Sequence, residues 1–264
     1  MHFTKMQGAG NDYVYVDGSR ENVQNPEELA RKISDRHFGV GSDGLVLILP
    51  GDGNSYDFQM RMFNADGSEA EMCGNASRCI GKYVYERGLT DRTEIRLKTG
   101  GGIKILRLRI QDGRVDSVTV DMGIPKAGID KIEVDGKVID IVRVDVGNPH
   151  CVLFVEDADQ YEVEKWGRKI EVHPAFPDRT NTEFVTVKSR NRLRMRVWER
   201  GSGETMACGT GACASLAAAV LRGLSDRKAY LELNGGTLEI EWMEEDEHLM
   251  MSGPAEFVFE GDWE

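Results

Sequence analysis

Apolar and polar residues alternate with a period of two in several stretches of the chain, which is the pattern of half-buried β-strands. Examples are "YVYVD", "EIRLKT", "IKILRLRI" and "RLRMRVWE". The stretches "ASRCIGKYVYER" and "ACASLAAAVLR", which follow Cys73 and Cys208, each predict one helix instead. The second is apolar all round as far as Arg222, so we expect it to be buried on every side. Gly88 and Gly223 suit the ends of these two helices.

A further helix is predicted over Pro26–His37. Asn25 is placed to cap its first turn, and Pro26 suits the first helical position, where an amide hydrogen has no helical partner. Strands and helices are therefore mixed along the chain, and the predicted fold class is α/β or α+β.

Landmarks of the first half of the chain return in the second half at one offset. Five pairs are 135 residues apart: Phe63 and Trp198, Glu69 and Glu204, Cys73 and Cys208, Arg87 and Arg222, and Gly100 and Gly235. Such a repeat predicts two homologous, pseudo-symmetric domains. We expect them over 1–113 and 114–253, each a curled sheet around a central helix, with an active site in the cleft between them.

The charge of the chain narrows the choice of partners. The formal net charge is −12 and the isoelectric point is near 5.0, which disfavours nucleic acid and anionic membranes as partners.

No apolar run approaches the roughly 18 residues of a membrane helix, and the start lacks the apolar core of a signal peptide. Five cysteines, an odd number, fit reduced thiols. We therefore expect a cytoplasmic protein with a small-molecule substrate, and the sequence leaves open whether the protein forms a homodimer.

Cys73 and Cys208 each stand where a loop becomes a helix. The first amides of a helix have no helical partner and lie at the positive end of its dipole. This position is expected to lower the pKa of a thiol below about 8.5, and it also suits a carboxylate. Gly74, Gly209 and Gly211 leave room for a ligand to approach the backbone.

Two facing halves would place one thiol on each side of the α-carbon of a bound amino acid. One cysteine, as thiolate, removes the α-proton, and the other, as thiol, returns a proton to the opposite face. This is the chemistry of a two-base racemase or epimerase. Amides directed at the carboxylate stabilise the carbanion, and one such donor is typically worth about 10²–10³ in rate. No pyridoxal-phosphate site is evident, so no cofactor is expected.

The remaining cysteines have a simpler interpretation. Cys79, Cys151 and Cys213 are typical of small buried hydrophobic residues. Paired C-x₂-C spacing is absent, so no metal site is expected. A disulfide between Cys73 and Cys208 would be an inactivated form.

The whole chain resembles the diaminopimelate epimerase family. The motifs that carry the resemblance are, in order, "GAGNDYV", "FNADGSEAEMCGNASRC", "GNPHCV", "DRTNTEFV" and "WERGSGETMACGTGACA". The resemblance implies cofactor-independent interconversion of LL- and meso-2,6-diaminoheptanedioate, a step of lysine and peptidoglycan-precursor biosynthesis, with Cys73 and Cys208 as the acid/base pair. It also implies that the last strand, at about 254–264, returns to the first domain.

The family motifs also carry over residues that hold the substrate. They are Asn11, Asn64, Gly74, Asn75, Asn148, Asn181, Glu199, Arg200, Gly209 and Thr210. Arg200 can bind a distal carboxylate through two hydrogen bonds, and Glu199 can accept from an ammonium. His150 resembles the family histidine near the reacting centre and is an auxiliary candidate. The alternatives are asparagines that only form turns, a solvated Glu199–Arg200 ion pair and a structural His150.

Two departures from the family pattern occur. Gly44, in "GVGSDGLVLI", replaces a glutamine of some members, and its lack of a side chain removes any contact there. Ala76 and Ser77 stand where Gly-Ala is common, with little expected effect.

Two other functions stay open. A proline racemase or hydroxyproline epimerase also uses two cysteines, but usually has histidine where this chain has Asn75. A non-catalytic amino-acid-binding protein or a thiol redox protein would not exchange an α-proton.

Overall fold

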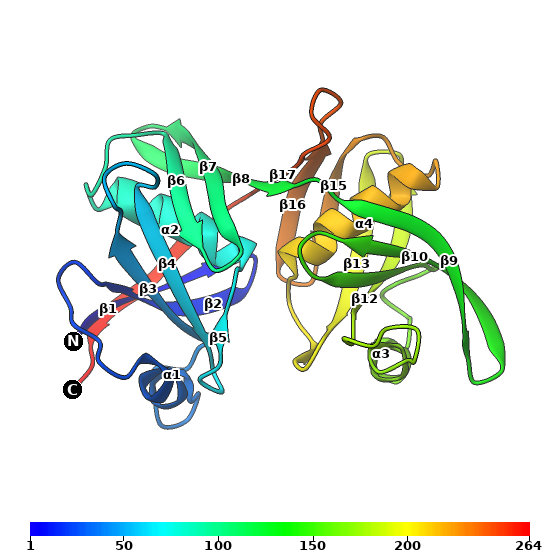
Figure 1. The fold of residues 1–264 in the computed structure, drawn as a ribbon, viewed down its shortest axis with the longest axis horizontal. Helices are drawn as coiled ribbons and strands as arrows, with labels where there is room; N and C mark the ends of the chain where they lie inside the picture. The colour runs from blue at the N-terminus through cyan, green and yellow to red at the C-terminus, as the bar shows by residue number, and fades with distance from the viewer. The chain divides into compact units, whose positions relative to one another are not determined.

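A computed structural model describes residues 1–264, with eighteen strands and four helices (Figure 1). The chain forms two compact units: unit 1 comprises Met1–Val120 and Gly253–Glu264, and unit 2 comprises Asp121–Ser252. Strand β8 (Arg114–Gly123) carries the chain from the first unit into the second. The boundary expected from the sequence, between residues 113 and 114, falls at the turn before β8, where Asp112 and Gly113 both have positive φ.

Eight strands of unit 1 pair in the order β18–β1–β2–β3–β4–β6–β7–β8. The pairs β2/β3 and β4/β6 are parallel and the others are antiparallel. The bounds are β18 (Glu256–Asp262), β1 (His2–Gly8), β2 (Asn11–Asp17), β3 (Gly44–Pro50), β4 (Phe58–Asn64), β6 (Glu94–Thr99) and β7 (Gly102–Gln111), with the short β5 (Glu69–Ala70) beside β4.

The strands of unit 2 repeat this arrangement in the order β9–β10–β11–β12–β13–β15–β16–β17. The parallel pairs, β11/β12 and β13/β15, occupy the same places in the order. The bounds are β9 (Lys126–Val134), β10 (Lys137–Asp145), β11 (Pro149–Phe154), β12 (Asn181–Ser189), β13 (Arg192–Glu199), β15 (Lys228–Leu233), β16 (Gly236–Trp242) and β17 (Leu249–Gly253), with β14 (Gly203–Glu204) beside β13. The predicted pseudo-symmetry of the two halves is confirmed.

One buried helix lies at the centre of each sheet (Figure 1). These helices, α2 (Gly74–Glu86) and α4 (Gly209–Leu221), each have 13 residues. Helix α4 contacts strands from β9 to β16, near both ends of the strand order, so the sheet curls around it. The small residues of "ACASLAAA" allow this close approach, and all eight are buried. Gly88 and Gly223, both at φ +70°, follow the C-cap residues, as predicted.

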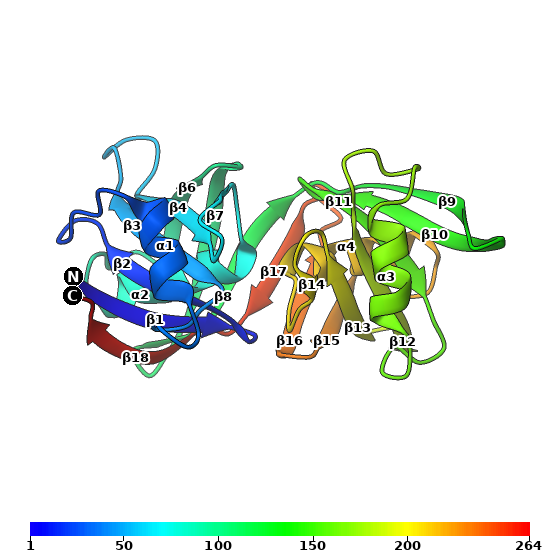
Figure 2. The ribbon, with the colours of Figure 1, turned by 90° about the horizontal axis from the view of Figure 1, so that it is seen from below.

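A second helix packs on the outer face of each sheet (Figure 2). Helix α1 (Pro26–Ser34) contacts β3 and β4, and α3 (Val163–Glu171) contacts β12 and β13. The predicted helix over Pro26–His37 is three residues too long, because the Asp35 carboxylate accepts the amides of His37 (2.7 Å) and Phe38 (2.8 Å) and turns the chain. The predicted Asn25 cap is also wrong, since its side chain makes no capping hydrogen bond.

Alternate residues of the strands face the two helices. In unit 2, Phe184 of β12 joins Val163 and Ile170 of α3 in one hydrophobic cluster. Its neighbour Glu183 points to the opposite face, toward α4, where its Oε1 lies close to Gly211. A charged side chain is thereby carried to the start of the central helix. None of the four helices combines the length and apolar character that a membrane-crossing segment needs.

Candidate functional site

Cys73 and Cys208 are the N-cap residues of the two central helices, and both have extended backbone angles. Each thiol accepts a hydrogen bond from the third amide of its own helix, from Ala76 N at 3.5 Å and Gly211 N at 3.4 Å. The first helical hydrogen bonds are accepted by the carbonyls of the two cysteines, at 2.9 Å each. In each helix the amides of the two residues after the cysteine come before the first helical hydrogen bond and have no partner within the helix. They belong to the four residues expected to bind the carboxylate: Gly74, Asn75, Gly209 and Thr210.

Asn11 links the Cys73 thiol to the start of β2. The thiol donates to Asn11 Oδ1 at 3.4 Å, and Asn75 Nδ2 donates to the same oxygen at 3.5 Å. Asn11 Nδ2 donates to Asp43 Oδ2 at 2.8 Å, which orients the amide with its oxygen toward the thiol. Three residues expected to share a site are therefore in contact within unit 1.

Asp43 is a residue that the sequence reasoning missed. It is joined to Asp12 through Arg36, whose Nη2 lies 2.9 Å from a carboxylate oxygen of each. Burial raises the pKa of Asp43, and the hydrogen bond from Asp12 N offsets this only in part. Asp43 directly precedes Gly44 in "GVGSDG", so an acidic residue beside a glycine-rich turn was the available signal.

Asn64 ends β4 and forms the turn that follows it. Its Nδ2 donates to Ser68 Oγ at 3.0 Å, and its backbone amide donates to Ser68 O at 2.9 Å. Asn64 pairs in register with Gly44 of β3. A Cβ atom at Gly44 would lie 2.0 Å from Phe63 O, so the backbone of β4 occupies the space of a side chain there. The lack of a side chain at Gly44, where some family members carry glutamine, therefore matches the lack of space for one beside β4.

The Cys208 thiol contacts the hydroxyl of Thr210. Thr210 Oγ1 lies 3.4 Å from Cys208 Sγ, and Asn148 Nδ2 donates to that hydroxyl oxygen at 3.4 Å. Asn148 stands just before β11, as Asn11 stands at the start of β2. Two candidate substrate-binding residues of unit 2 are therefore joined to the candidate catalytic thiol.

His150 is buried, and both of its ring nitrogens have partners. Nε2 lies 3.0 Å from Asn148 Oδ1, and Nδ1 lies 2.6 Å from Glu183 Oε1. The side chains of His150 and Glu183 are both 0% exposed. Glu183 lies within the quoted "DRTNTEFV" but was not singled out; a charged residue at an inward position of an apolar strand was the available signal.

Glu199 and Arg200 follow one another at the end of β13 but have different partners. Thr205 Oγ1 donates to Glu199 Oε1, and burial raises the pKa of the Glu199 carboxyl. The Arg200 side chain is exposed, and its Nη1 donates to Asp178 O at 2.9 Å. Asn181 Oδ1 accepts the Arg200 backbone amide at 2.8 Å, which anchors this loop to the start of β12.

The expected lowering of the thiol pKa is wrong for Cys208. Burial raises its pKa well above the ordinary value, and the nearby carboxylates of Glu199 and Glu183 add to the rise. The hydrogen bonds from Thr210 and from Gly211 N act in the opposite direction but do not outweigh them. The position at a helix start was visible in the sequence, whereas the approach of the two carboxylates, from β12 and from the end of β13, was not.

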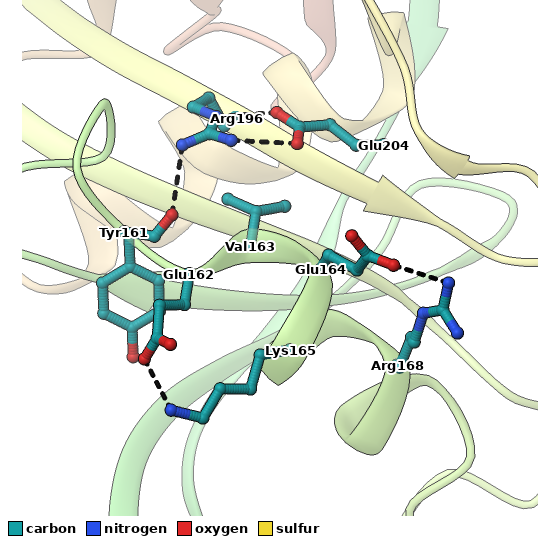
Figure 3. Close-up of a pocket in the computed structure, with 8 residues that line it drawn as sticks. All are labelled: Tyr161, Glu162, Val163, Glu164, Lys165, Arg168, Arg196 and Glu204. Atoms are coloured by element: carbon teal, nitrogen blue, oxygen red, sulfur yellow. Dashed lines mark hydrogen bonds and ion pairs between the residues drawn. The ribbon is translucent and has the colours of Figure 1, made fainter.

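One hollow of unit 2 lies elsewhere, beside the start of α3 (Figure 3). It has a volume of about 550 Å³. Its charged side chains form ion pairs with one another: Arg196 with Glu204, Lys165 with Glu162, and Arg168 with Glu164. None of the candidate site residues lines it, so we treat it as a surface feature.

Comparisons with known proteins agree on one family. The family model for diaminopimelate epimerase matches residues 3–127 and 142–258. A diaminopimelate epimerase of Acetivibrio thermocellus is 55% identical over 276 residues, covering 99% of this chain and 98% of that protein. One from Methanococcus maripaludis (strain S2) is 52% identical over 276 residues, covering 99% of each.

Solved structures share the fold at much lower identity. A hydroxyproline epimerase from Agrobacterium vitis has a TM-score of 0.74 at 15% identity, covering 99% of this chain and 91% of that chain. A phenazine biosynthesis protein of the PhzF family from Bacillus anthracis has a TM-score of 0.76 at 16% identity, covering 99% and 98%. At such identities the likeness shows the fold alone.

Proposed function

The chain belongs to the diaminopimelate epimerase family, and on that premise we propose that Cys73 and Cys208 are the two acid/base residues of an isomerase that epimerises diaminopimelate. The observation that supports this most directly is the equivalent place of the two thiols. Each caps a buried central helix of one pseudo-symmetric unit, and each accepts an amide of that helix. Two thiols in equivalent places match a reaction in which two faces of one carbon are treated alike.

In the proposed reaction a thiolate takes the α-proton and the electron pair of the C–H bond stays on the α-carbon. The other thiol then gives its proton to the opposite face and becomes a thiolate, so the configuration inverts and no atom is gained or lost. The raised pKa of Cys208 suits it to give a proton in one direction of the reaction, in which Cys73 would take the α-proton.

The carbanion needs stabilisation, because the α-C–H group of an amino acid is a much weaker acid than a thiol. The amides of Gly74, Asn75, Gly209 and Thr210 supply donors at the positive ends of the two central helices. We propose that they bind the carboxylate of the reacting centre, where negative charge develops. Each well-placed donor contributes about 10²–10³ to the rate.

The second amino-acid head of diaminopimelate requires its own contacts. We propose that Arg200 binds the distal carboxylate and that Glu199 accepts from an ammonium. The exposed guanidinium of Arg200 and the anchoring of its backbone by Asn181 support this role. Asn11, Asn148 and Asn64 are proposed to complete the substrate site, and His150 is proposed to assist proton management.

The test is deuterium entry at the α-carbon in heavy water without added cofactor. We expect exchange with LL- and meso-diaminopimelate, and none with proline, hydroxyproline or lysine. A requirement for pyridoxal phosphate would contradict the two-thiol mechanism. Exchange with proline instead would favour a proline racemase. Binding of diaminopimelate without any exchange would indicate a non-catalytic binding protein.

The proline-racemase alternative has less support from the site. Asn75 stands where those enzymes usually have histidine, and its Nδ2 contacts Asn11 Oδ1 at 3.5 Å.

A further inference from the structure

A continuous chain of hydrogen bonds runs from a buried carboxylate to the Cys208 thiol in unit 2. Its four contacts are Glu183 Oε1 to His150 Nδ1 (2.6 Å), His150 Nε2 to Asn148 Oδ1 (3.0 Å), Asn148 Nδ2 to Thr210 Oγ1 (3.4 Å) and Thr210 Oγ1 to Cys208 Sγ (3.4 Å). Glu183, at the buried end, has no role in the reaction proposed above. The other end is one of its two reacting groups.

The direction of donation along the chain follows from the atoms that can only accept or only donate. Asn148 Oδ1 accepts, so His150 Nε2 carries a hydrogen. Asn148 Nδ2 donates to Thr210 Oγ1, and in the contact between Thr210 Oγ1 and Cys208 Sγ either atom can be the donor. Once Cys208 is a thiolate its sulfur can only accept, so the Thr210 hydroxyl donates to it and every donor from the imidazole onward points toward the sulfur. Aligned hydrogen bonds of this kind polarise one another and favour negative charge at the end they point to.

The state of the buried end follows from a proton count. Nε2 of His150 is protonated, and a contact of 2.6 Å between Nδ1 and Glu183 Oε1 needs one more proton between them. The pair is then neutral as a whole, either as an ion pair or as neutral imidazole with a carboxylic acid. Full burial favours this, because a bare carboxylate beside a neutral ring would leave one uncompensated charge away from water. Glu183 Oε2, which is buried without a hydrogen-bond partner, makes a bare carboxylate still less favourable.

Glu183 is also packed tightly against the first turn of α4. A Cβ atom at Gly211 would lie 2.8 Å from Glu183 Oε1 and 3.3 Å from Cys208 Sγ. Glycine at this position lets the carboxylate approach the helix start. The carboxylate therefore has little freedom to leave the imidazole.

We propose that Glu183 is a positioning residue that keeps His150 protonated on Nε2 and, through Asn148, directs the Thr210 hydroxyl at Cys208. This row of hydrogen bonds stabilises the thiolate that Cys208 becomes after it has given its proton away. This role rests on the proposed acid/base function of Cys208. It opposes the effect of burial and of the Glu199 carboxylate on the same thiol. Glu183 would raise the pKa of Cys208 only as a bare carboxylate, and the proton that it shares with His150 removes that net charge.

The test is the rate at which iodoacetamide labels Cys208, read by peptide mapping as a function of pH, in the wild-type chain and in Glu183→Gln. Glutamine keeps the volume but cannot share the extra proton. We expect labelling at pH 8 to slow on the order of tenfold, which is the change that one pKa unit makes in the thiolate fraction. A bare anionic Glu183 would give the opposite sign, because removing a negative charge near the thiol would speed labelling. Faster or unchanged labelling of Glu183→Gln would therefore overturn the proposal.

A second variant tests whether the effect passes through the chain. The Thr210→Val variant lacks the hydroxyl that contacts Cys208, so the link between Glu183 and the thiol is already broken. Adding Glu183→Gln to it should change the labelling rate of Cys208 by less than about twofold. An undiminished effect in the double variant would refute transmission through Thr210.

Thr182→Val is the matched control. Thr182 adjoins Glu183 on β12, is equally buried, and its hydroxyl has no hydrogen-bond partner. We expect its Cys208 labelling to equal the wild type; slowing as large as in Glu183→Gln would mean that any change in β12 has this effect.

A measurement on the wild type needs no variant to fold. Nitrogen-15 NMR of labelled histidine should show a hydrogen on Nε2 of His150 at neutral pH, and a bare Nε2 would disprove the proposal. Neither labelling nor NMR requires turnover. Absence of deuterium exchange in the wild type would therefore reject the proposed function while leaving the hydrogen-bond chain testable.

Discussion

Gly44 lies against the backbone of Phe63 so closely that a Cβ atom at Gly44 would be 2.0 Å from the Phe63 carbonyl oxygen. The same atom would be 2.8 Å from the Tyr13 ring. Gly44 is the first residue of β3 and directly follows Asp43, which orients Asn11. The contact therefore limits how closely β3 and β4 approach next to Asp43, which is joined through Asn11 to the Cys73 thiol.

Substitution of Gly44 should be costly for this reason. We expect Gly44→Ala to lower the free energy of unfolding by about 1–3 kcal/mol, the usual cost of overpacking a filled site. Urea denaturation measures it. Gly128→Ala is the matched control, since nothing lies within 4 Å of a Cβ there and its backbone is not left-handed. Equal stabilities of the two variants would show that β4 moves away at little cost.

Loss of either candidate acid/base thiol should stop epimerisation. We expect Cys73→Ala and Cys208→Ala each to reduce turnover to background, measured by α-deuterium exchange. Each also loses an N-cap acceptor, worth typically about 1 kcal/mol, so a modest fall in stability is expected. Cys73→Ser and Cys208→Ser keep a capping oxygen and should restore the stability without the activity. Near-normal turnover in any of these variants would exclude its cysteine from the reaction.

Oxidation offers a test of whether the two thiols meet in solution. If both act on one carbon, mild oxidation should join Cys73 to Cys208 and stop turnover until a reductant is added. Peptide mapping without prior reduction identifies the bridge. A bridge from Cys73 to Cys79 in its place would argue against the facing arrangement.

Glu171 should matter for the loop that carries Arg200. Its carboxylate accepts from Trp198 Nε1 at 2.7 Å and from Gly201 N at 2.8 Å, and it pairs with Arg179. Glu171→Ala leaves buried donors unpaired, so we expect a loss of about 1–3 kcal/mol of unfolding free energy. KM for diaminopimelate should rise because the loop loses its anchor. Glu164→Ala, an exposed residue of the same helix, should change neither quantity.

Asp57 should make stability depend on pH in the acid range. The hydrogen bond from Arg96 holds the pKa of Asp57 below its usual value, against the effect of burial. A lowered folded-state pKa gives stabilisation that is present above the ordinary value of about 3.8 and is lost as the pH falls through the folded-state pKa. Asp57→Asn should therefore be less stable than the wild type at pH 7, and the gap should narrow below about pH 4. A gap that is constant from pH 7 to pH 2.5 in urea titrations would contradict this.

Patterns that are local, or that compare one segment with another, were readable without coordinates. The period-two runs predicted β2, β6, β7 and β13, and the 135-residue offset predicted the pseudo-symmetry. The positions of Cys73 and Cys208 before glycines predicted thiols at helix starts, and both proved to be N-caps. Hydrophobic periodicity and capping depend on residues within a turn or two of each other, so the chain encodes them directly.

Only the tertiary structure decided the electrostatics around those thiols. The sequence placed Cys208 at a favourable helix start, but it did not reveal that burial and the Glu199 carboxylate raise the thiol pKa, or that Glu183 reaches the same place from another strand. It likewise left open whether Asn64 forms a turn, and it placed the end of α1 three residues too late. Burial and the approach of charges depend on which strands pair and on the face each residue takes, and those are properties of the assembled sheet.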